Sequence, residues 1–228
     1  MIEITDHLAQ IRARVTQALT EANRVNEDVT IVAVSKKQST DAMRTVFANG
    51  ITHFGESYVD EALPKMSELS DIAAIWHFIG RIQSNKTRDI AARFDWVHSL
   101  DRERIARRLD IQRPYHASPL NVLIQVNLAG ESQKGGVDGA GALRLAELVD
   151  SLPRLSLRGV MTIPPAAMTG AQLLDHYASV ADLAGRLSLA GHCCDVLSMG
   201  MSRDFEAAIA AGSNCLRIGT ALFGARTG

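Results

Sequence analysis

The chain has 228 residues, 46% of them hydrophobic, and a formal net charge of -1 at pH 7. This length suits one barrel-sized domain, and the mixed charges show no basic stripe typical of a nucleic-acid binder. No stretch approaches the ~20 apolar residues of a membrane span, and the N-terminus, with Glu3 and Asp6, lacks the apolar run of a signal peptide. Cys193, Cys194 and Cys215 have no C-x-x-C spacing, so we expect no disulfide framework and no metal site. We expect the three cysteines to be buried, inert thiols of a protein in a reducing cytoplasm.

Short apolar runs alternate with amphipathic stretches along the chain. The first stretch carries Leu8, Ile11, Val15 and Leu19 on one helical face, which predicts an N-terminal helix. Helical patterns then follow almost every apolar run, one of them opened by Ser202 and closed by a glycine. The runs predict strands at residues 31–35, 51–55, 74–80, 94–100, 121–127, 157–163, 195–200 and 215–219.

Eight strands alternating with helices predict parallel βαβ units closed into a single (β/α)8 TIM barrel domain over residues 1–228, with an extra N-terminal helix. An open doubly wound sheet is the alternative. The first strand-to-helix turn, SKKQST at 35–40, has no glycine fingerprint of a dinucleotide site, which disfavours that alternative. Little chain follows the eighth strand, so we expect the N-terminal helix to cover the gap there.

Strand alternation separates the two lysines that end the first strand. Val32, Val34 and Lys36 share one face, and bulky branched residues of a barrel strand point inward. Lys36 is therefore predicted to lie in the barrel mouth, where barrel enzymes place their chemistry, and Lys37 to point away. An amine near apolar walls is a usable nucleophile toward a carbonyl ligand. The alternative is a strand-end charge that reaches solvent.

The ends of the last two strands predict a phosphate site. Ser198-Met199-Gly200 and Gly219-Thr220 each combine a glycine with a hydroxyl, and barrels often bind phosphate after strands seven and eight. The alternative is that the glycines form turns and the hydroxyls cap helices. A lysine and a phosphate site in one mouth favour a phosphorylated aldehyde, such as pyridoxal 5'-phosphate (PLP).

Arg217 is predicted to point inward with Cys215 and Gly219. A guanidinium does not give up its proton in a protein, so it could donate to a pyridine nitrogen and leave that nitrogen unprotonated. The ring would then be a weaker electron sink for carbanion chemistry. The alternatives are a pair with a carboxylate or a direct contact with the phosphate.

The sequence resembles the pyridoxal phosphate homeostasis protein family over nearly its whole length. The motifs that carry this resemblance are AVSK (33–36), FGESYV (54–59), WHFIGRIQSNK (76–86), LIQVN (123–127), LRGVMTIP (157–164), LSMGMS (197–202) and RIGTALFGAR (217–226).

The resemblance implies a cytoplasmic PLP-binding barrel of fold type III, like that of alanine racemase. The cofactor would be held as a Schiff base on Lys36. The implied phosphate ligands are Ser198, Gly219 and Thr220, with the Met199 backbone beside them, and Arg217 would lie at the ring nitrogen.

The chain departs from the family pattern at two places. It reads SKKQS where the family has VSKTKP, and Ser57 replaces the asparagine of GENYV. We do not transfer the contact of that asparagine.

Three functions remain open from sequence alone. The first is a PLP carrier in vitamin B6 homeostasis, without assigned catalytic residues, which contacts apo PLP enzymes transiently. The second is a PLP-dependent amino-acid racemase or lyase, and the third is a phosphate-binding aldolase that uses Lys36. Racemases of this fold take an opposed base from an additional C-terminal domain and a dimer partner, and the sequence ends at Gly228, so we expect a monomeric carrier.

Three other features of the sequence carry expectations of their own. We expect His77 to be a core or hydrogen-bonded histidine and His53 to have a packing role. The glycine-rich loop at 131–136 is a candidate lid, in which Lys134 is expected to be solvated, with a contact to a ligand carboxylate as the alternative.

Overall fold

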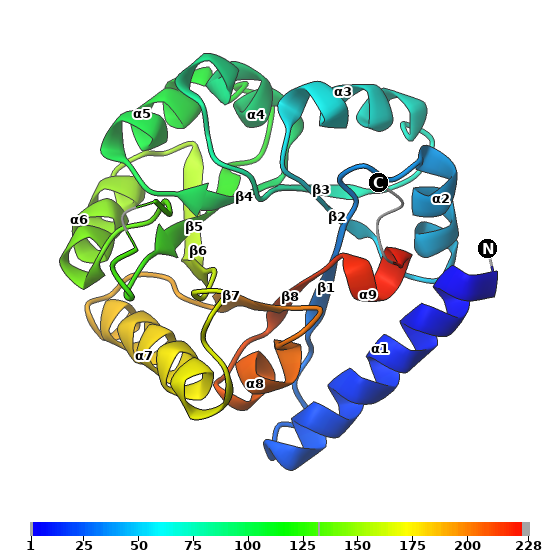
Figure 1. Ribbon diagram of the computed structural model, residues 1–228. Coiled ribbons are helices and arrows are strands. Elements are labelled where there is room, and N and C mark those ends of the chain that lie inside the picture. Colours follow the sequence, from blue (N-terminus) through cyan, green and yellow to red (C-terminus); the bar gives the residue numbers. More distant parts are fainter. Residues whose placement is uncertain (1, 132, 225–228) are drawn as a thin grey trace.

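A computed structural model describes residues 2–131 and 133–224, and its strands form a closed parallel barrel (Figure 1). Each strand pairs with the next along the chain, and β8 pairs with β1. The strands are β1 (Thr30–Val34), β2 (His53–Glu56), β3 (Ile75–Phe78), β4 (Trp96–Leu100), β5 (Leu120–Val126), β6 (Leu155–Thr162), β7 (Val196–Met201) and β8 (Cys215–Ile218). The closed barrel confirms the predicted fold and rules out the open sheet.

Helices surround the barrel on its outside (Figure 1). They are α1 (Ile2–Glu21), α2 (Thr40–Ala48), α3 (Val59–Glu68), the 3-10 helix η1 (Ser84–Lys86), α4 (Thr87–Arg93), α5 (Glu103–Gln112), α6 (Gly139–Asp150), α7 (Gly170–Leu189), α8 (Phe205–Ala210) and α9 (Thr220–Phe223). Among the described residues, no helix combines the length and the apolar character needed to cross a membrane.

The N-terminal helix occupies the predicted place. α1 packs against α2, α8 and α9, so it covers the barrel where the last helix is only one turn long. Leu8, Ile11 and Val15 of its apolar face are buried. The prediction for α8 was wrong at its start: the helix begins at Phe205 after the N-cap residue Asp204, so Ser202 lies in the preceding turn.

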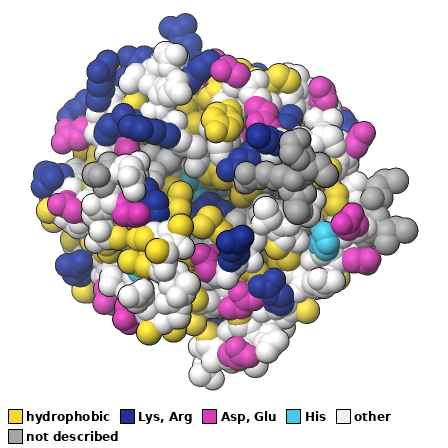
Figure 2. All heavy atoms as spheres, viewed as in Figure 1, with side chains coloured by type: hydrophobic (Ala, Val, Ile, Leu, Met, Phe, Trp, Pro, Cys, Tyr) yellow, Lys and Arg dark blue, Asp and Glu magenta, His cyan; other side chains and the backbone are white. Residues whose placement is uncertain are grey.

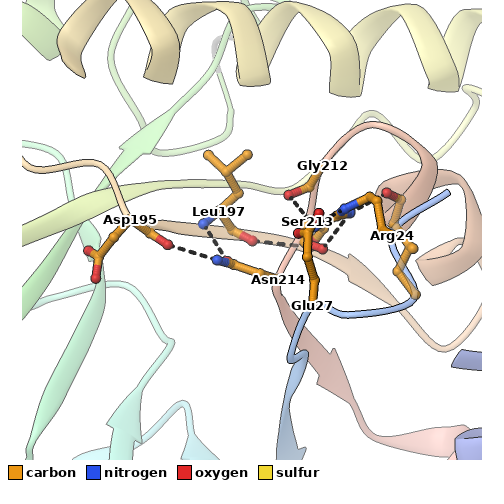
Figure 3. A network of polar contacts seen from close by, with 8 residues as sticks. Arg24, Glu27, Asp195, Leu197, Gly212, Ser213 and Asn214 are labelled. Carbon is orange, nitrogen blue, oxygen red and sulfur yellow. Dashed lines mark hydrogen bonds and ion pairs between the residues drawn. The ribbon is translucent and has the colours of Figure 1, made fainter. Parts of the chain in front are cut away.

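A polar network joins the loop after α1 to the amino ends of β7 and β8 (Figure 3). Arg24 pairs with Glu27 at 2.6 Å and donates to the carbonyl oxygens of Gly212 and Ser213. Asn214 accepts from the Leu197 N–H at 2.9 Å, and Ser213 donates to the carbonyls of β7. Backbone groups at this end of the barrel therefore have partners without a ligand.

The inside of the barrel is more polar than we expected. Val32 faces inward, but its register partner on β8 is Arg217. His98 on β4 contacts Ser198 on β7 at 2.9 Å, and Arg217 on β8 reaches the Thr162 carbonyl on β6. Because these strands are not neighbours, such side chains meet only across the interior. The main apolar core instead lies between the sheet and the helices.

Candidate functional site

One cavity of about 760 Å³ opens at the carboxyl ends of the strands. Its lining comes from the ends of β1, β2, β3, β7 and β8, from the segment between β5 and α6, and from the segment that leads from β6 into α7. Figure 2 shows a hollow near the centre of the face seen in Figure 1. The lining includes Lys36, Arg217, Gly219 and Thr220, so four of the six predicted site residues meet in one place.

The two lysines after β1 lie as strand alternation predicts. Lys36 is half-buried and lines the cavity together with Val34. Lys37 is exposed and has a φ of 62°, in the left-handed region that non-glycine residues rarely adopt. Its backbone N–H donates to the carboxylate of Glu61. Of these two lysines, therefore, Lys36 is the one that faces the mouth, and Lys37 begins the connection to α2.

A buried cluster of ion pairs between β2 and α3 stabilises this turn. Lys65 of α3 donates to the Ser35 carbonyl at 2.7 Å and to the Glu56 carboxylate at 2.8 Å, and it also pairs with Glu61 at 2.6 Å. Ser35 donates its hydroxyl to the same Glu56 oxygen. Burial raises the pKa of Glu56, and Lys65 opposes that rise. The backbone on both sides of Lys36 is thus tied to β2 and α3.

Arg217 is buried inside the barrel and still reaches the cavity. It donates to the Ser198 carbonyl, to the Ser198 hydroxyl and to the Thr162 carbonyl, at 2.6, 2.6 and 2.7 Å. Burial lowers its pKa, but a guanidinium starts so high that it keeps its charge. A guanidinium has five N–H bonds, so two remain for a ligand. No described carboxylate pairs with it, unlike the alternative considered from sequence.

The end of β8 supplies a short turn on the cavity wall. Gly219 precedes the single turn of α9, and Thr220 is exposed and lines the cavity. The backbone N–H of Ala221 donates to the Ser202 hydroxyl at 3.1 Å, so Ser202 lies beside this turn and also lines the cavity.

Ser198 and Met199 do not lie where we expected them. Both are fully buried and neither lines the cavity. The Ser198 hydroxyl contacts His98 and accepts from Arg217 inside the barrel. Strand β7 continues through Gly200 to Met201, so Ser198 sits deeper than the strand end. Ser202, which sequence reasoning treated only as a helix cap, is the β7-side hydroxyl that reaches the cavity.

Two glycines allow the chain to close around this site. Gly200 has a φ of 93°, and a Cβ there would lie 2.7 Å from the Cβ of Ala208. Gly80 comes so close to Ser57 that a Cβ would lie 2.0 Å from the Ser57 carbonyl oxygen. Ser57 itself lines the cavity, so the departure from GENYV falls on the site.

Lys134 and Asp204 also line the cavity. Lys134 pairs with Glu131 at 2.6 Å and donates to the Pro164 carbonyl, so it is anchored rather than freely solvated. Asp204 accepts from the backbone N–H of Met201 at 2.6 Å. Because of this bond, the backbone N–H of Met201 is not available to an anion in the cavity. The helix dipole of α8 adds little there, since the helix has only six residues.

Sequence reasoning missed most of the polar groups behind the site. Glu56 lies in the FGESYV motif, but nothing in the sequence indicated its pair with Lys65, and His98 was not singled out. His77 is hydrogen-bonded, as we expected, and His53 is bonded to it rather than merely packed. The signal that could have found these groups is a polar residue within an otherwise apolar strand.

The profile of the family described as alanine racemase, N-terminal domain, matches residues 7–227. A curated relative from Pseudomonas aeruginosa, named pyridoxal phosphate homeostasis protein, is 48% identical over 226 residues, covering 99% of this chain and 97% of the relative. The chain belongs to the pyridoxal phosphate homeostasis protein family. A relative from Escherichia coli with the same name is 44% identical over 99% of this chain and 98% of its own.

Solved structures agree with this family membership. PipY from Synechococcus elongatus, solved without PLP, superposes with a TM-score of 0.88 at 34% identity and covers 97% of this chain and 100% of PipY. The structure of PipY with PLP bound gives a TM-score of 0.86 at 33% identity, with the same coverage of both chains. An alanine racemase from Corynebacterium glutamicum, at 16% identity and a TM-score of 0.72, covers 97% of this chain and 62% of its own, and shares the fold alone.

Proposed function

We propose that this member of the pyridoxal phosphate homeostasis protein family binds PLP in the mouth cavity and holds it as a carrier in vitamin B6 homeostasis. The observation that carries the proposal is the meeting of Lys36, Arg217 and the Gly219-Thr220 turn in one cavity of about 760 Å³. PLP requires an amine for its aldehyde, a donor for its ring nitrogen and further donors for its phosphate, and these residues offer all three. When bound, pyridoxal phosphate supplies an aldehyde that condenses with an amine and a pyridine ring that acts as the electron sink.

Each side chain has a separate role in the proposal. The amine of Lys36 is the nucleophile for the aldehyde carbon, and the turn behind it keeps that amine in the mouth. Arg217 would donate one of its two remaining N–H bonds to the ring nitrogen. Since it does not give up its proton, the nitrogen stays unprotonated and the electron sink stays weak. This favours holding the cofactor over catalysis on amino acids.

The phosphate position needs one revision of the sequence-based assignment. We place the phosphate at the hydroxyls of Thr220 and Ser202 and at the backbone of Gly219, because these line the cavity. The Ser198 hydroxyl is already engaged by His98 and Arg217. A monomeric state, a cytoplasmic location and transient contact with apo PLP enzymes belong to the same proposal.

The test is to titrate the protein with PLP, reduce it with borohydride and map the modified peptide. We expect the pyridoxyl group on Lys36. Lys36→Ala should abolish the modification, while Lys37→Ala, the matched control on the exposed side of the turn, should leave it intact. Modification of Lys37 or Lys134 in the wild-type protein would contradict the proposed site.

A further inference from the structure

A chain of five hydrogen-bonded side chains crosses the barrel interior. His53 Nδ1 lies 2.8 Å from His77 Nε2, and His77 Nδ1 lies 2.8 Å from His98 Nε2. His98 Nδ1 is 2.9 Å from the Ser198 hydroxyl, which in turn accepts from Arg217 at 2.6 Å. Five different strands supply these side chains: β2, β3, β4, β7 and β8.

This series of hydrogen-bonded side chains connects the two ends of the barrel. Arg217 lines the mouth cavity, while His53 is only half-buried and lines a second cavity of about 430 Å³ beside α1 and the start of β1. His77 and His98 between them are buried. Trp96 stacks on His77 with ring centroids 5.5 Å apart, which fixes the plane of that imidazole.

Hydrogen-bonding capacity restricts how the protons are arranged. A guanidinium only donates, and each neutral imidazole has one donor and one acceptor. If the Ser198 hydroxyl donates to His98 Nδ1, then His98 Nε2–H donates to His77 Nδ1. His77 Nε2–H then donates to His53 Nδ1. Every imidazole lone pair that accepts in this order faces the Arg217 charge. The reverse order points the imidazole N–H dipoles at that charge and leaves the Ser198 hydroxyl hydrogen without an acceptor in the series.

The charge environment supports neutral rings in the middle of the chain. Burial lowers the pKa of His77 and of His98 well below the ordinary value, and Arg217 lowers that of His98 further. Burial also lowers the pKa of His53, and Asp95 opposes this effect. A proton added at His53 Nδ1 would point at the Nε2–H of His77. The proton order therefore disfavours protonation of His53 at this nitrogen.

We propose that His98, acting through the Ser198 hydroxyl, is a positioning residue for Arg217, and that His77 and His53 set the tautomer of His98. Without the hydroxyl as an oriented acceptor, one of the three bonds that aim the guanidinium is lost. The inference rests on the proposed function in one respect, namely that PLP is the ligand that Arg217 contacts. The proton order is a property of the protein without any ligand.

The first test needs no cofactor. In ¹⁵N-labelled protein without PLP, ring nitrogen shifts should show His53, His77 and His98 as neutral Nε2–H tautomers at pH 7. Couplings across the two N–H···N bonds should identify the donors as His98 and His77. An Nδ1–H tautomer or a charged ring at His77 or His98 would overturn the proposal.

The second test measures the affinity of matched variants for PLP and for unphosphorylated pyridoxal. Ser198→Ala and His98→Leu should each weaken both ligands by a similar factor, about 10-fold for one lost bond to a charged group. His98→Asn keeps an acceptor near the Nδ1 position, so it should restore most of the affinity. The absorption band of the bound ligand should shift in His98→Leu and not in His98→Asn.

The outcomes separate this inference from the proposed function. A loss confined to PLP in Ser198→Ala would make that hydroxyl a phosphate ligand and overturn the inference. Unchanged affinity for both ligands in Ser198→Ala would overturn it as well. If the wild-type protein binds neither ligand, the proposed function fails while the tautomer measurement still decides the proton order.

Discussion

The adjacent residues Lys36 and Lys37 carry the same charge, but the backbone conformation directs their side chains to different places. Both follow the last residue of β1 in a turn, where Lys36 lines the mouth cavity and Lys37, in a left-handed conformation, is exposed. The same sensitivity applies on the phosphate side, where Ser202 and Thr220 reach the cavity and Ser198 does not. At the residue scale, the composition of the site depends on the side of a strand or turn from which each polar side chain projects.

Thr220→Val tests the phosphate turn at this scale. Valine keeps the volume and removes the hydroxyl, and a hydrogen bond to a charged group is worth about 1.5–3 kcal/mol. We expect PLP to bind about 10- to 150-fold more weakly and pyridoxal to bind unchanged, as measured by spectroscopic titration. Thr45→Val on α2, which does not line the cavity, is the control. Unchanged PLP affinity in Thr220→Val would leave only backbone groups for the phosphate on this strand.

The turn between β1 and α2 owes its shape to elements that follow it in the chain. Lys65 of α3 and Glu56 of β2 form a buried pair whose hydrogen bonds reach back to Ser35. Taking two charges out of water is costly, so breaking one partner leaves the other charge uncompensated. The pair is thus a vulnerable point as well as a support for Lys36.

Lys65→Met should therefore destabilise the fold strongly. We expect a loss of about 3–5 kcal/mol in the free energy of unfolding, measured by urea denaturation, because Glu56 is left buried without its cation. Arg44→Met removes the cation of the exposed Arg44–Asp71 pair and should cost much less than Lys65→Met, because solvent screens that pair. Adding Glu56→Gln to Lys65→Met should recover part of the loss. Equal effects of Lys65→Met and Arg44→Met would contradict the buried-pair interpretation.

The barrel as a whole has an apolar layer outside its sheet and a polar chain within it. His77 and His98 are neutral in the folded state because burial holds their pKa values well below the ordinary value. In the unfolded chain both would accept protons near pH 6.5. The unfolded state then binds more protons as the pH falls, so their contribution to stability is present above pH 6.5 and lost below it.

The free energy of unfolding should accordingly fall between pH 7 and pH 5. Each of the two histidines contributes a slope of up to about 1.4 kcal/mol per pH unit below its unfolded pKa. Urea denaturation across this range would measure the slope. Replacing the exposed His116 by Gln should leave it unchanged, whereas His77→Phe should reduce it. A pH-independent stability in the wild-type protein would exclude neutral buried rings.

Apolar periodicity indicated the eight strands, and alternation within them predicted that Lys36 and Arg217 face inward, because both patterns are local properties of the sequence. The depth of each residue within the barrel was decided only in three dimensions. Gly200 suggested a strand end, yet β7 runs on to Met201 and its pairing with β8 shifts there, so Ser198 lies one layer below the mouth. Likewise, no local pattern brings together β2, β3, β4, β7 and β8. The histidine chain exists because closing the barrel makes distant strands face one another across a space narrow enough for hydrogen bonds.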